Sequence, residues 1–383
     1  MNNLFEQLGV NESVANGLKK LGIETPTDIQ TQIIPLALTN KDIIGRSQTG
    51  SGKTLAYLLP LYEKIDINKK EMQIIILAPT HELVMQVYNT INSLSQNSGV
   101  NVTAASIIGD ANINRQIEKL RLKPHIVVGT PGRILELIKR RKISAHTIKT
   151  IIIDEADILL DINNIDGVKA VIKTTQRDRQ LQLFSATITD ETIATAKVMM
   201  KEAELISLED KNEINSNIEH YYFTCEQRDK IDLLRKLVHA INPQKALVFI
   251  NRSEDIEITT SKLKYHKLAV EGIHGTNIKE DRKKALGDFR NGKIQLLVAS
   301  DLASRGLDIE GITHVFNLDV PEKSINYLHR VGRCGRAGNN GIAITLTTER
   351  ELDHIKHYEK TFDIKIHHKD LFKGDVVDKQ NYY

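Results

Sequence analysis

Short apolar runs alternate with longer amphipathic segments along most of the chain. Each run is rich in isoleucine, leucine and valine and has the length of a strand, while the segments between the runs favour helices. Alternating strands and helices predict parallel sheets that are buried between helices. The predicted strands are IIILA (74–78), IVVG (126–129), IIID (151–154), LQLFS (181–185), ALVFI (246–250), LLVAS (296–300), HVFNL (314–318) and IAITL (342–346).

One polar segment, LEDKNEINSN (208–217), interrupts this alternation and has no apolar periodicity. A segment of this kind predicts a linker, and 383 residues suffice for two domains that each bury a core. We therefore expect an α/β protein with a first domain over 1–207, a linker over 208–217 and a second domain over 218–383. The chain end, KGDVVDKQNYY, is polar, so we expect roughly the last ten residues to be frayed.

Charge and composition restrict the classes of function. The chain has 52 Lys and Arg against 49 Asp and Glu, a formal net charge of +3, so any nucleic-acid site must be local. The two cysteines, Cys225 and Cys334, lack metal-ligand spacing and fit a reducing cytoplasm. No run of eighteen apolar residues and no signal peptide are apparent, which predicts a soluble cytoplasmic protein without a membrane partner; we also expect a monomer.

A glycine-rich loop occurs in DIIGRSQTGSGKT (42–54), between a short apolar strand and a helical segment, LAYLLPLYEKI. Backbone N–H groups of such a loop form an anion site, Lys53 can reach the β and γ phosphates, and Thr54 can ligate Mg²⁺. The loop departs from the pattern G-x-x-x-x-G-K-[ST] at its first position, where Ser47 stands. The predicted nucleotide-binding residues of the loop are Ser47, Gln48, Thr49, Gly50, Ser51, Gly52, Lys53 and Thr54.

The stretch TIIIDEAD (150–157) ends in three carboxylates. Its isoleucines predict a buried strand, and ligands of open α/β sheets bind at the carboxyl ends of strands. We expect Asp154 to hold Mg²⁺ through its water shell and Glu155 to polarise an attacking water. Acids also favour the first turn of a helix, but a helix start requires no phosphate loop upstream.

These motifs together resemble those of a known family. The sequence D-E-A-D at 154–157, with SQTGSGKT (47–54), SAT (185–187) and HRVGRCGRAG (329–338), resembles the DEAD-box ATP-dependent RNA helicases of superfamily 2. The resemblance covers roughly residues 5 to 350, with the motifs in the family's order. It implies two tandem RecA-like domains, ATP between them and single-stranded RNA across both, in a bacterial core without an added RNA-binding domain.

The resemblance also implies how the adenine is bound. GIETPTDIQ (22–30) resembles the family's Q motif, in which Gln30 would recognise the adenine edge and Ile23 would pack on its face. Phe5 matches the isolated aromatic residue upstream of that motif. An amide suits adenine because it pairs with both a donor and an acceptor.

In the second half, the resemblance implies further contacts with ATP. Asp308 would meet the ribose, and Arg333 and Arg336 would act as arginine fingers on the γ-phosphate. A guanidinium presented to the developing charge of phosphoryl transfer is worth about a thousandfold or more in rate.

Four residues are implied to couple the nucleotide site to domain closure. Ser185 and Thr187 would bond toward Asp157, and His329 would couple the cleft. Serine and threonine after a strand are otherwise common turn residues, so this role rests on the resemblance.

RNA contacts are implied in loops whose backbone and hydroxyl donors would hold phosphates without recognising bases. The candidates are Thr80, Gly109, Thr130, Gly132, Arg133, Asn251, Arg252, Arg282 and Ser300. Five positions depart from the family pattern, namely His81, Asp110, Lys279, Ser300 and Cys334. Asp110 places a negative charge near the implied RNA path, which favours a lower RNA affinity.

The implied activity is ATP-dependent separation of short RNA duplexes without processive tracking, because a closed state that bends one strand disrupts only a few base pairs. Ribosomal RNA or a pre-ribosomal particle is the preferred substrate. Two other functions stay open: an ATP-gated RNA clamp or assembly factor, and a DNA-directed translocase.

Overall fold

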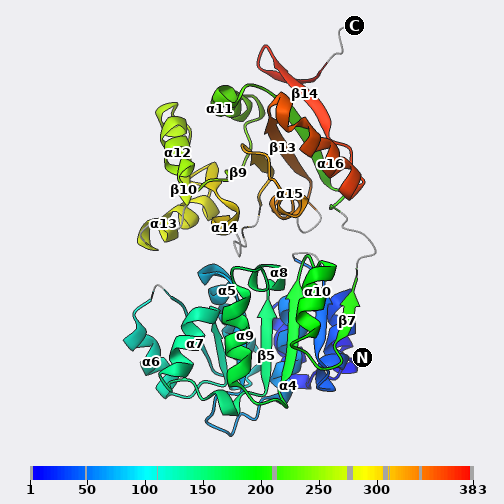
Figure 1. Cartoon of the computed structure of the whole chain (residues 1–383), viewed down its shortest axis with the longest axis vertical. Helices are drawn as coiled ribbons and strands as arrows, with labels where there is room; N and C mark the ends of the chain where they lie inside the picture. The colour runs from blue at the N-terminus through cyan, green and yellow to red at the C-terminus, as the bar shows by residue number, and fades with distance from the viewer. Residues whose placement is uncertain are drawn as a thin grey trace. The chain divides into compact units, whose positions relative to one another are not determined.

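The computed structural model describes residues 3–47, 50–109, 111–208, 214–273, 279–304, 309, 311–335 and 339–379. The chain divides into two compact units, Met1–Asp210 and Lys211–Tyr383, here called domain 1 and domain 2 (Figure 1). The division falls inside the segment 208–217 that the sequence predicts to be a linker. Of the helices in the described ranges, none is long and apolar enough to cross a membrane.

Within the described residues, domain 1 contains a seven-stranded sheet in the order β3-β4-β2-β5-β6-β1-β7, with every neighbouring pair parallel. Its strands are β1 (Ile43–Arg46), β2 (Ile74–Leu77), β3 (Ala104–Ile107), β4 (Ile126–Gly129), β5 (Thr150–Asp154), β6 (Gln180–Ser185) and β7 (Glu204–Ser207). Its helices are α1 (Leu4–Gln7), α2 (Glu12–Lys20), α3 (Asp28–Leu38), α4 (Lys53–Lys64), α5 (His81–Ser98), α6 (Ile113–Arg121), α7 (Pro131–Lys139), η1 (Ala145–Thr147), α8 (Ala156–Leu159), α9 (Ile165–Thr174) and α10 (Asp190–Lys197).

Both faces of this sheet are covered by helices, which explains why strands such as β2 (IIIL) and β4 (IVVG) are apolar throughout. Successive side chains of a strand point to opposite faces, so Ile152 packs in the core beneath α1 to α5, whereas Ile151 and Ile153 pack in the core beneath α6 to α10. The isoleucines of β5 therefore anchor the carboxylates that follow them from both sides.

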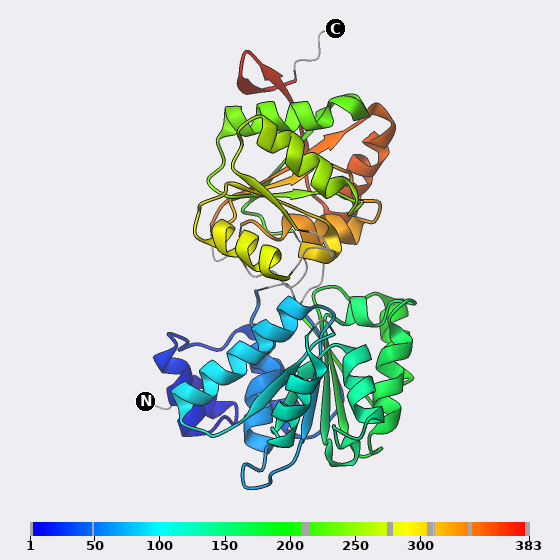
Figure 2. The ribbon, with the colours of Figure 1, turned by 90° about the vertical axis from the view of Figure 1, so that its left-hand side faces the viewer.

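Domain 2 contains, in the part of the chain that the structure describes, an eight-stranded sheet in the order β10-β11-β9-β12-β13-β8-β14-β15. Its strands are β8 (Ile218–Thr224), β9 (Ala246–Phe249), β10 (Val270–Ile273), β11 (Leu296–Ala299), β12 (His314–Asn317), β13 (Gly341–Thr347), β14 (His367–Phe372) and β15 (Asp375–Asp378). Its helices are η2 (Gln227–Asp229), α11 (Lys230–Ile241), α12 (Asp255–Tyr265), α13 (Lys279–Arg290), α14 (Asp301–Ser304), α15 (Ser324–Val331), η3 (Glu349–Glu351) and α16 (Leu352–Phe362). Helices α11 and α12 cover one face and α13 to α16 the other (Figure 2). The two parallel-dominant sheets confirm the predicted α/β class.

The expectation that roughly the last ten residues are frayed is wrong for the described part of that segment. Strand β15 pairs antiparallel with β14, and Leu371 and Val376 pack against the core beneath α11. The two strands are joined by Lys373 and Gly374, whose φ angles are 52° and 94°. Positive φ at both central residues is typical of a tight two-residue hairpin turn. This polar segment therefore forms a hairpin, which its composition did not indicate.

The folding of domain 2 should depend on pH through His220, which is buried in β8. Burial lowers the pKa of His220 from 6.5 to about 4, so the unfolded chain binds the extra proton between these values. Its contribution to stability is present above the unfolded pKa of 6.5 and is lost as the pH falls from there toward 4. We expect the free energy of opening of the β8 amides to fall by about 2 kcal/mol between pH 7 and pH 5.

Hydrogen exchange of the full-length protein, corrected for intrinsic rates, measures this change. In the variant His220→Gln the fall should be about 2 kcal/mol smaller, because the glutamine does not titrate. An equal fall in both proteins would contradict the assignment.

Candidate nucleotide site and nucleic-acid interface

The phosphate loop of domain 1 connects the end of β1 to the start of α4. The backbone N–H of Ser47 donates to the carbonyl of Ser185 at 3.1 Å, which ties the start of the loop to the end of β6. Gly52 caps the helix with a φ of 93°, and a Cβ at this position would lie 2.4 Å from the amide nitrogen of Gln30. The predicted anion site therefore lies at a helix N-terminus, where backbone donors are available. Gln48 and Thr49 lie outside the described residues.

Gln30 connects the Q-motif segment to this loop. Its Oε1 accepts from the backbone N–H of Thr27 at 3.0 Å, and its Nε2 donates to the carbonyl of Gly52 at 3.1 Å. The side chain is 2% exposed. Ile23 is partly buried against the core, and Phe5 is fully buried within it. The structure thus places Gln30 against the phosphate loop and Phe5 in the hydrophobic core, and adenine binding by either stays a prediction.

Lys53 and Asp154 are both buried beside the loop. The Nζ of Lys53 donates to the carbonyl of Ser47. Asp154 is the last residue of β5 and is 4% exposed. Burial raises the pKa of its carboxyl group, while a hydrogen bond from Tyr57 and the positive charge of Lys53 oppose this rise. Burial outweighs these two influences, so the pKa of Asp154 lies above its ordinary value.

Tyr57 is a residue of this site that the sequence analysis missed. Its hydroxyl donates to Oδ2 of Asp154 at 2.9 Å, while Oδ1 of Asp154 accepts from the backbone N–H of Glu155 at 3.0 Å. Burial raises the pKa of Tyr57 well above its ordinary value, so it stays a donor. The spacing from Lys53 to Tyr57 is one helical turn, which is the signal that could have indicated a shared face.

This arrangement fits a bound Mg²⁺. Thr54 is the predicted direct ligand and Asp154 the predicted ligand through the water shell, and the Tyr57 hydroxyl orients the Asp154 carboxyl group. Hydroxyl and carboxylate oxygens are the donors that Mg²⁺ prefers, with several of its waters retained.

Glu155 has a left-handed backbone conformation, with φ of 52°. A residue with a Cβ in this region carries strain of about 1 kcal/mol or more, and such strain persists where surrounding structure imposes it. Here the strand β5 ends and α8 begins at the next residue. The predicted activation of water by Glu155 stays a prediction.

Asp157 accepts hydrogen bonds from both residues that the resemblance implied. The Oγ of Ser185 donates to its Oδ1 at 2.7 Å and the Oγ1 of Thr187 donates to its Oδ2 at 2.9 Å. Asp157 follows β5, Ser185 is the last residue of the neighbouring strand β6, and Thr187 follows it. The contact is present in the structure, and its coupling role stays a prediction.

The candidate RNA contacts of domain 1 follow the other strands of the same sheet. Thr80 caps α5 after β2, and its Oγ1 accepts from the N–H of Leu83 at 3.3 Å. Thr130 caps α7 after β4, with Gly132 in the first turn, and Gly109 follows β3. Because β3, β4 and β2 are neighbours and parallel, these segments emerge at one edge of the sheet.

The Arg133 side chain contacts other residues of domain 1. Its guanidinium donates to the carbonyls of Gly109 and Ala111 and forms an ion pair with Glu136. Gln116, which the sequence analysis missed, holds the same loop through three hydrogen bonds to the backbone of Ile108 and Ala111. Arg133 and Gln116 therefore position the loop, and an RNA contact by Arg133 stays a prediction. Asp110 lies outside the described residues.

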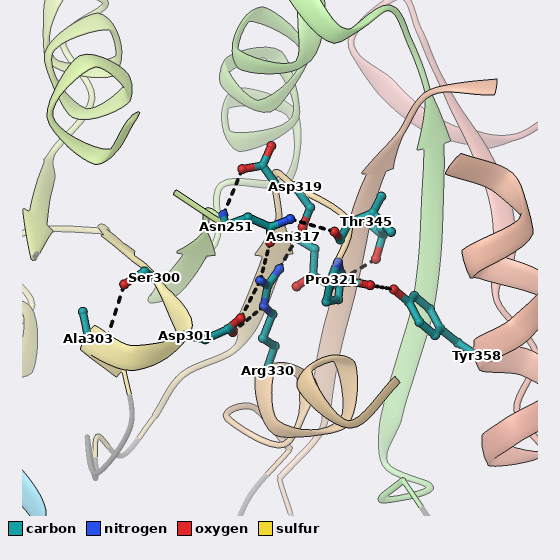
Figure 3. A network of polar contacts seen from close by, with 11 residues as sticks. Asn251, Ser300, Asp301, Ala303, Asn317, Asp319, Pro321, Arg330, Thr345 and Tyr358 are labelled. Atoms are coloured by element: carbon teal, nitrogen blue, oxygen red, sulfur yellow. Dashed lines mark hydrogen bonds and ion pairs between the residues drawn. The ribbon is translucent and has the colours of Figure 1, made fainter. Parts of the chain in front are cut away.

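Arg330 organises the candidate loops of domain 2 (Figure 3). It is 1% exposed, and it donates from Nε and Nη2 to the carboxylate of Asp301 at 2.6 and 2.9 Å. Nη2 also donates to Oδ1 of Asn251 at 2.7 Å, and Nη1 donates to the carbonyl of Asp319 at 2.8 Å. Asn251 follows β9 and Asp301 follows β11. No sequence pattern singles out Arg330, although it adjoins His329 in the arginine-rich motif.

The remaining predicted residues of domain 2 lie around this network. Ser300 accepts from the N–H of Ala303 at 3.4 Å, and Arg282 donates to the carbonyl of Ala303 at 2.9 Å. Arg252 is exposed beside Asn251. His329 is in the last turn of α15, and Arg333 follows that helix. Asp308 and Arg336 lie outside the described residues.

Comparison with known proteins agrees with the motifs. Residues 27–196 match the family described as DEAD/DEAH box helicase, and residues 229–338 match the family described as helicase conserved C-terminal domain. The chain is 40% identical over 360 residues to the DEAD-box ATP-dependent RNA helicase CshC of Bacillus cereus, covering 94% of this chain and 92% of that protein. It is 38% identical to the DEAD-box ATP-dependent RNA helicase CshA of Geobacillus kaustophilus, covering 93% of this chain and 76% of that protein.

Solved structures with the same fold include helicases bound to RNA. S. cerevisiae Dbp5 bound to RNA and ADP BeF3 is similar with a TM-score of 0.88 at 29% identity, covering 96% of this chain and 95% of that one. A form of Mss116p bound to single-stranded RNA and AMP-PNP is similar with a TM-score of 0.85 at 25% identity, covering 95% of this chain and 77% of that one. Both domains have the predicted tandem RecA-like fold.

The hydroxyl of Tyr57 should affect how strongly a nucleotide depends on Mg²⁺. In Tyr57→Phe the ring remains but Asp154 loses a hydrogen bond, so the Mg²⁺ concentration for half-maximal ATP binding should rise about tenfold. Equilibrium titration with a fluorescent ATP analogue measures this.

The matched control is Tyr62→Phe on the same helix, where the hydroxyl donates to the carbonyl of Ile91 at 2.7 Å. That variant should lose about 1 kcal/mol of stability and keep the wild-type Mg²⁺ dependence. Equal dependence in all three proteins would show that Tyr57 does not orient Asp154.

Arg330→Met should destabilise domain 2, because it removes the partner of the Asp301 carboxylate. We expect a loss of about 3 kcal/mol, at the low end for a broken buried pair, since 25% of the Asp301 side chain is exposed. Hydrogen exchange of the amides of β9 and β11 reports it.

Arg235→Met is the control, since Arg235 pairs with Asp232 at the surface. This substitution should lower the stability of domain 2 by less than about 1 kcal/mol. A loss of the same size in the two variants would refute the central role of Arg330.

Proposed function

The chain belongs to the DEAD-box family of ATP-dependent RNA helicases, and we propose that it couples ATP binding and hydrolysis to closure of its two domains on RNA. Closure then separates short RNA duplexes locally, without processive tracking. The observation that carries this proposal is the arrangement of segments at the carboxyl ends of the domain 1 strands. There the segments after β5, β6 and β1 contain the residues that we propose for nucleotide binding, and those after β3, β4 and β2 contain the residues that we propose for RNA contact.

ATP binding rests on the phosphate loop and its neighbours. Lys53 contacts the β and γ phosphates, and Thr54 and Asp154 hold Mg²⁺, the latter through water. When bound, Mg²⁺ neutralises charge on the phosphate oxygens. Glu155 accepts a proton from the attacking water, which its place directly after Asp154 supports.

Domain 2 completes the reaction in this proposal. Arg333 and Arg336 stabilise the charge that develops on the γ-phosphate, and Asp308 contacts the ribose. Because the fingers and the phosphate loop belong to different domains, hydrolysis requires the closed state. His329, Asp157, Ser185 and Thr187 connect closure to the nucleotide.

The RNA strand is held through its phosphates and sugars by both domains. Opening six stacked steps costs roughly 8 kcal/mol, taking about 1.4 kcal/mol per step from DNA. One binding event can supply this amount, whereas dozens of pairs at once are out of reach. We propose structured RNA in the cytoplasm as the substrate, ribosomal RNA or a pre-ribosomal particle being preferred.

RNA should stimulate ATP hydrolysis, and single-stranded DNA should not. In Glu155→Gln the stimulated rate should fall by about a hundredfold or more, because the general base is lost, while ATP binding remains. Steady-state hydrolysis with no nucleic acid, with single-stranded DNA and with structured RNA measures this.

Two outcomes would change the proposal. Stimulation by single-stranded DNA equal to that by RNA would favour a DNA-directed translocase. ATP-dependent RNA binding with no separation of a six-pair duplex would favour an RNA clamp or assembly factor.

A further inference from the structure

The first described residues of domain 2 contact the loop that follows α15. The side-chain Nδ2 of Asn215 donates to the carbonyl of Gly335. The Oδ1 of the same side chain accepts from the backbone N–H of Asn217 at 3.0 Å, and its backbone carbonyl accepts from Ile218 at 3.0 Å. Asn215 is therefore held in a turn that directs its amide nitrogen toward Gly335.

The other end of that loop is held by the same segment. The backbone N–H of Gly341 donates to the carbonyl of Asn217 at 2.9 Å. A Cβ on Gly341 would lie 2.6 Å from the backbone nitrogen of Gly335, so the two ends of the loop are in close approach. Gly335 and Gly341, here called the base of the loop, thus lie against each other. Asn215 holds Gly335, and Asn217 holds Gly341.

Gly335 is conformationally suited to this base. Its φ is 67°, and a Cβ there would lie 2.7 Å from Cγ1 of Ile218. Any other residue would be strained and would crowd the side chain of Ile218. The arrangement requires glycine for two independent reasons.

The same base is continuous with the arginine-bearing segment. The backbone N–H of Arg333 donates to the carbonyl of Arg330 at 3.1 Å, and that of Cys334 donates to Val331 at 3.2 Å. The Cys334 side chain is buried in the core that contains Ile214 and Ile218. The turn from α15 to Gly335 is therefore fixed at both ends, with Arg333 inside it.

We propose that Asn215 is a positioning residue for ATP hydrolysis: it ties the point where the chain enters domain 2 to Gly335, which ends the turn that contains Arg333. This inference rests on the proposed function, because it assigns a role to residues of that same site. Asn215 contacts neither ATP nor RNA in the proposal and acts through Gly335. Its loss leaves ATP binding by domain 1 intact and slows only the chemical step.

The test is Asn215→Asp in the full-length protein. Aspartate keeps the acceptor for the N–H of Asn217 and replaces the donor to Gly335 by an oxygen, so only the contact with the loop is lost. We expect kcat of RNA-stimulated ATP hydrolysis to fall about tenfold, while KM for ATP and the affinity for RNA change less than about twofold.

Gln295→Glu is the matched control, since the Gln295 amide also donates to a backbone carbonyl in domain 2, that of Pro243 at 2.7 Å. It should leave kcat unchanged. Should Asn215→Asp not fold, Asn215→Ser is measured instead, because serine retains a short acceptor for the local turn and cannot reach Gly335.

An unchanged kcat in a folded variant overturns the proposal, as does a matching rise in KM with kcat constant. Wild-type protein that binds ATP but is not stimulated by RNA overturns the proposed function and this role of Asn215 with it. A lower kcat confined to the Asn215 variants supports both.

Discussion

In a parallel sheet every strand points the same way, so the segments that follow the strands all begin on the same side of the sheet, at the carboxyl ends of the strands. Domain 1 applies this constraint to six neighbouring strands in the order β3-β4-β2-β5-β6-β1. The first three are followed by Gly109 and by the caps of α7 and α5. The last three lead into the Asp157 contacts and the phosphate loop, with the buried Asp154 at the end of β5. Strand order alone thus separates the proposed nucleotide and RNA sites and keeps them adjacent.

Domain 2 follows the same constraint with a different means of fixing its loops. The segments after β9 and β11 are held by one buried guanidinium, that of Arg330, which contacts Asn251, Asp301 and the backbone of Asp319. A planar group with five donors can satisfy three loops at once. The geometry of this half therefore depends on a charge, where domain 1 depends on packed isoleucines.

The sequence predicts most inner strands of the two sheets, but it omits the edge strands β3, β7, β10 and β15 and also the inner strands β8 and β14. Central strands are apolar on both faces and are recognisable by composition, whereas an edge strand such as VEGI (270–273) carries polar residues. Motif spacing likewise located Lys53, Asp154 and Asp157. It could not indicate Tyr57, which lies 97 positions from Asp154, or Arg330, which lies 79 positions from Asn251. Such pairs depend on strand order, which no local pattern specifies.

The hairpin at the end of domain 2 has a consequence for solubility. Without it, β8 would expose a seven-residue strand, including Tyr221 and Phe223, as an unpaired edge. The hairpin pairs with part of β8, so the edge strand of the sheet is β15 and not β8. Strand β15 is short, begins with Asp375 and ends with Asp378. Charges on a short edge strand oppose pairing with another chain. A polar chain end thereby protects the sheet from edge-to-edge aggregation.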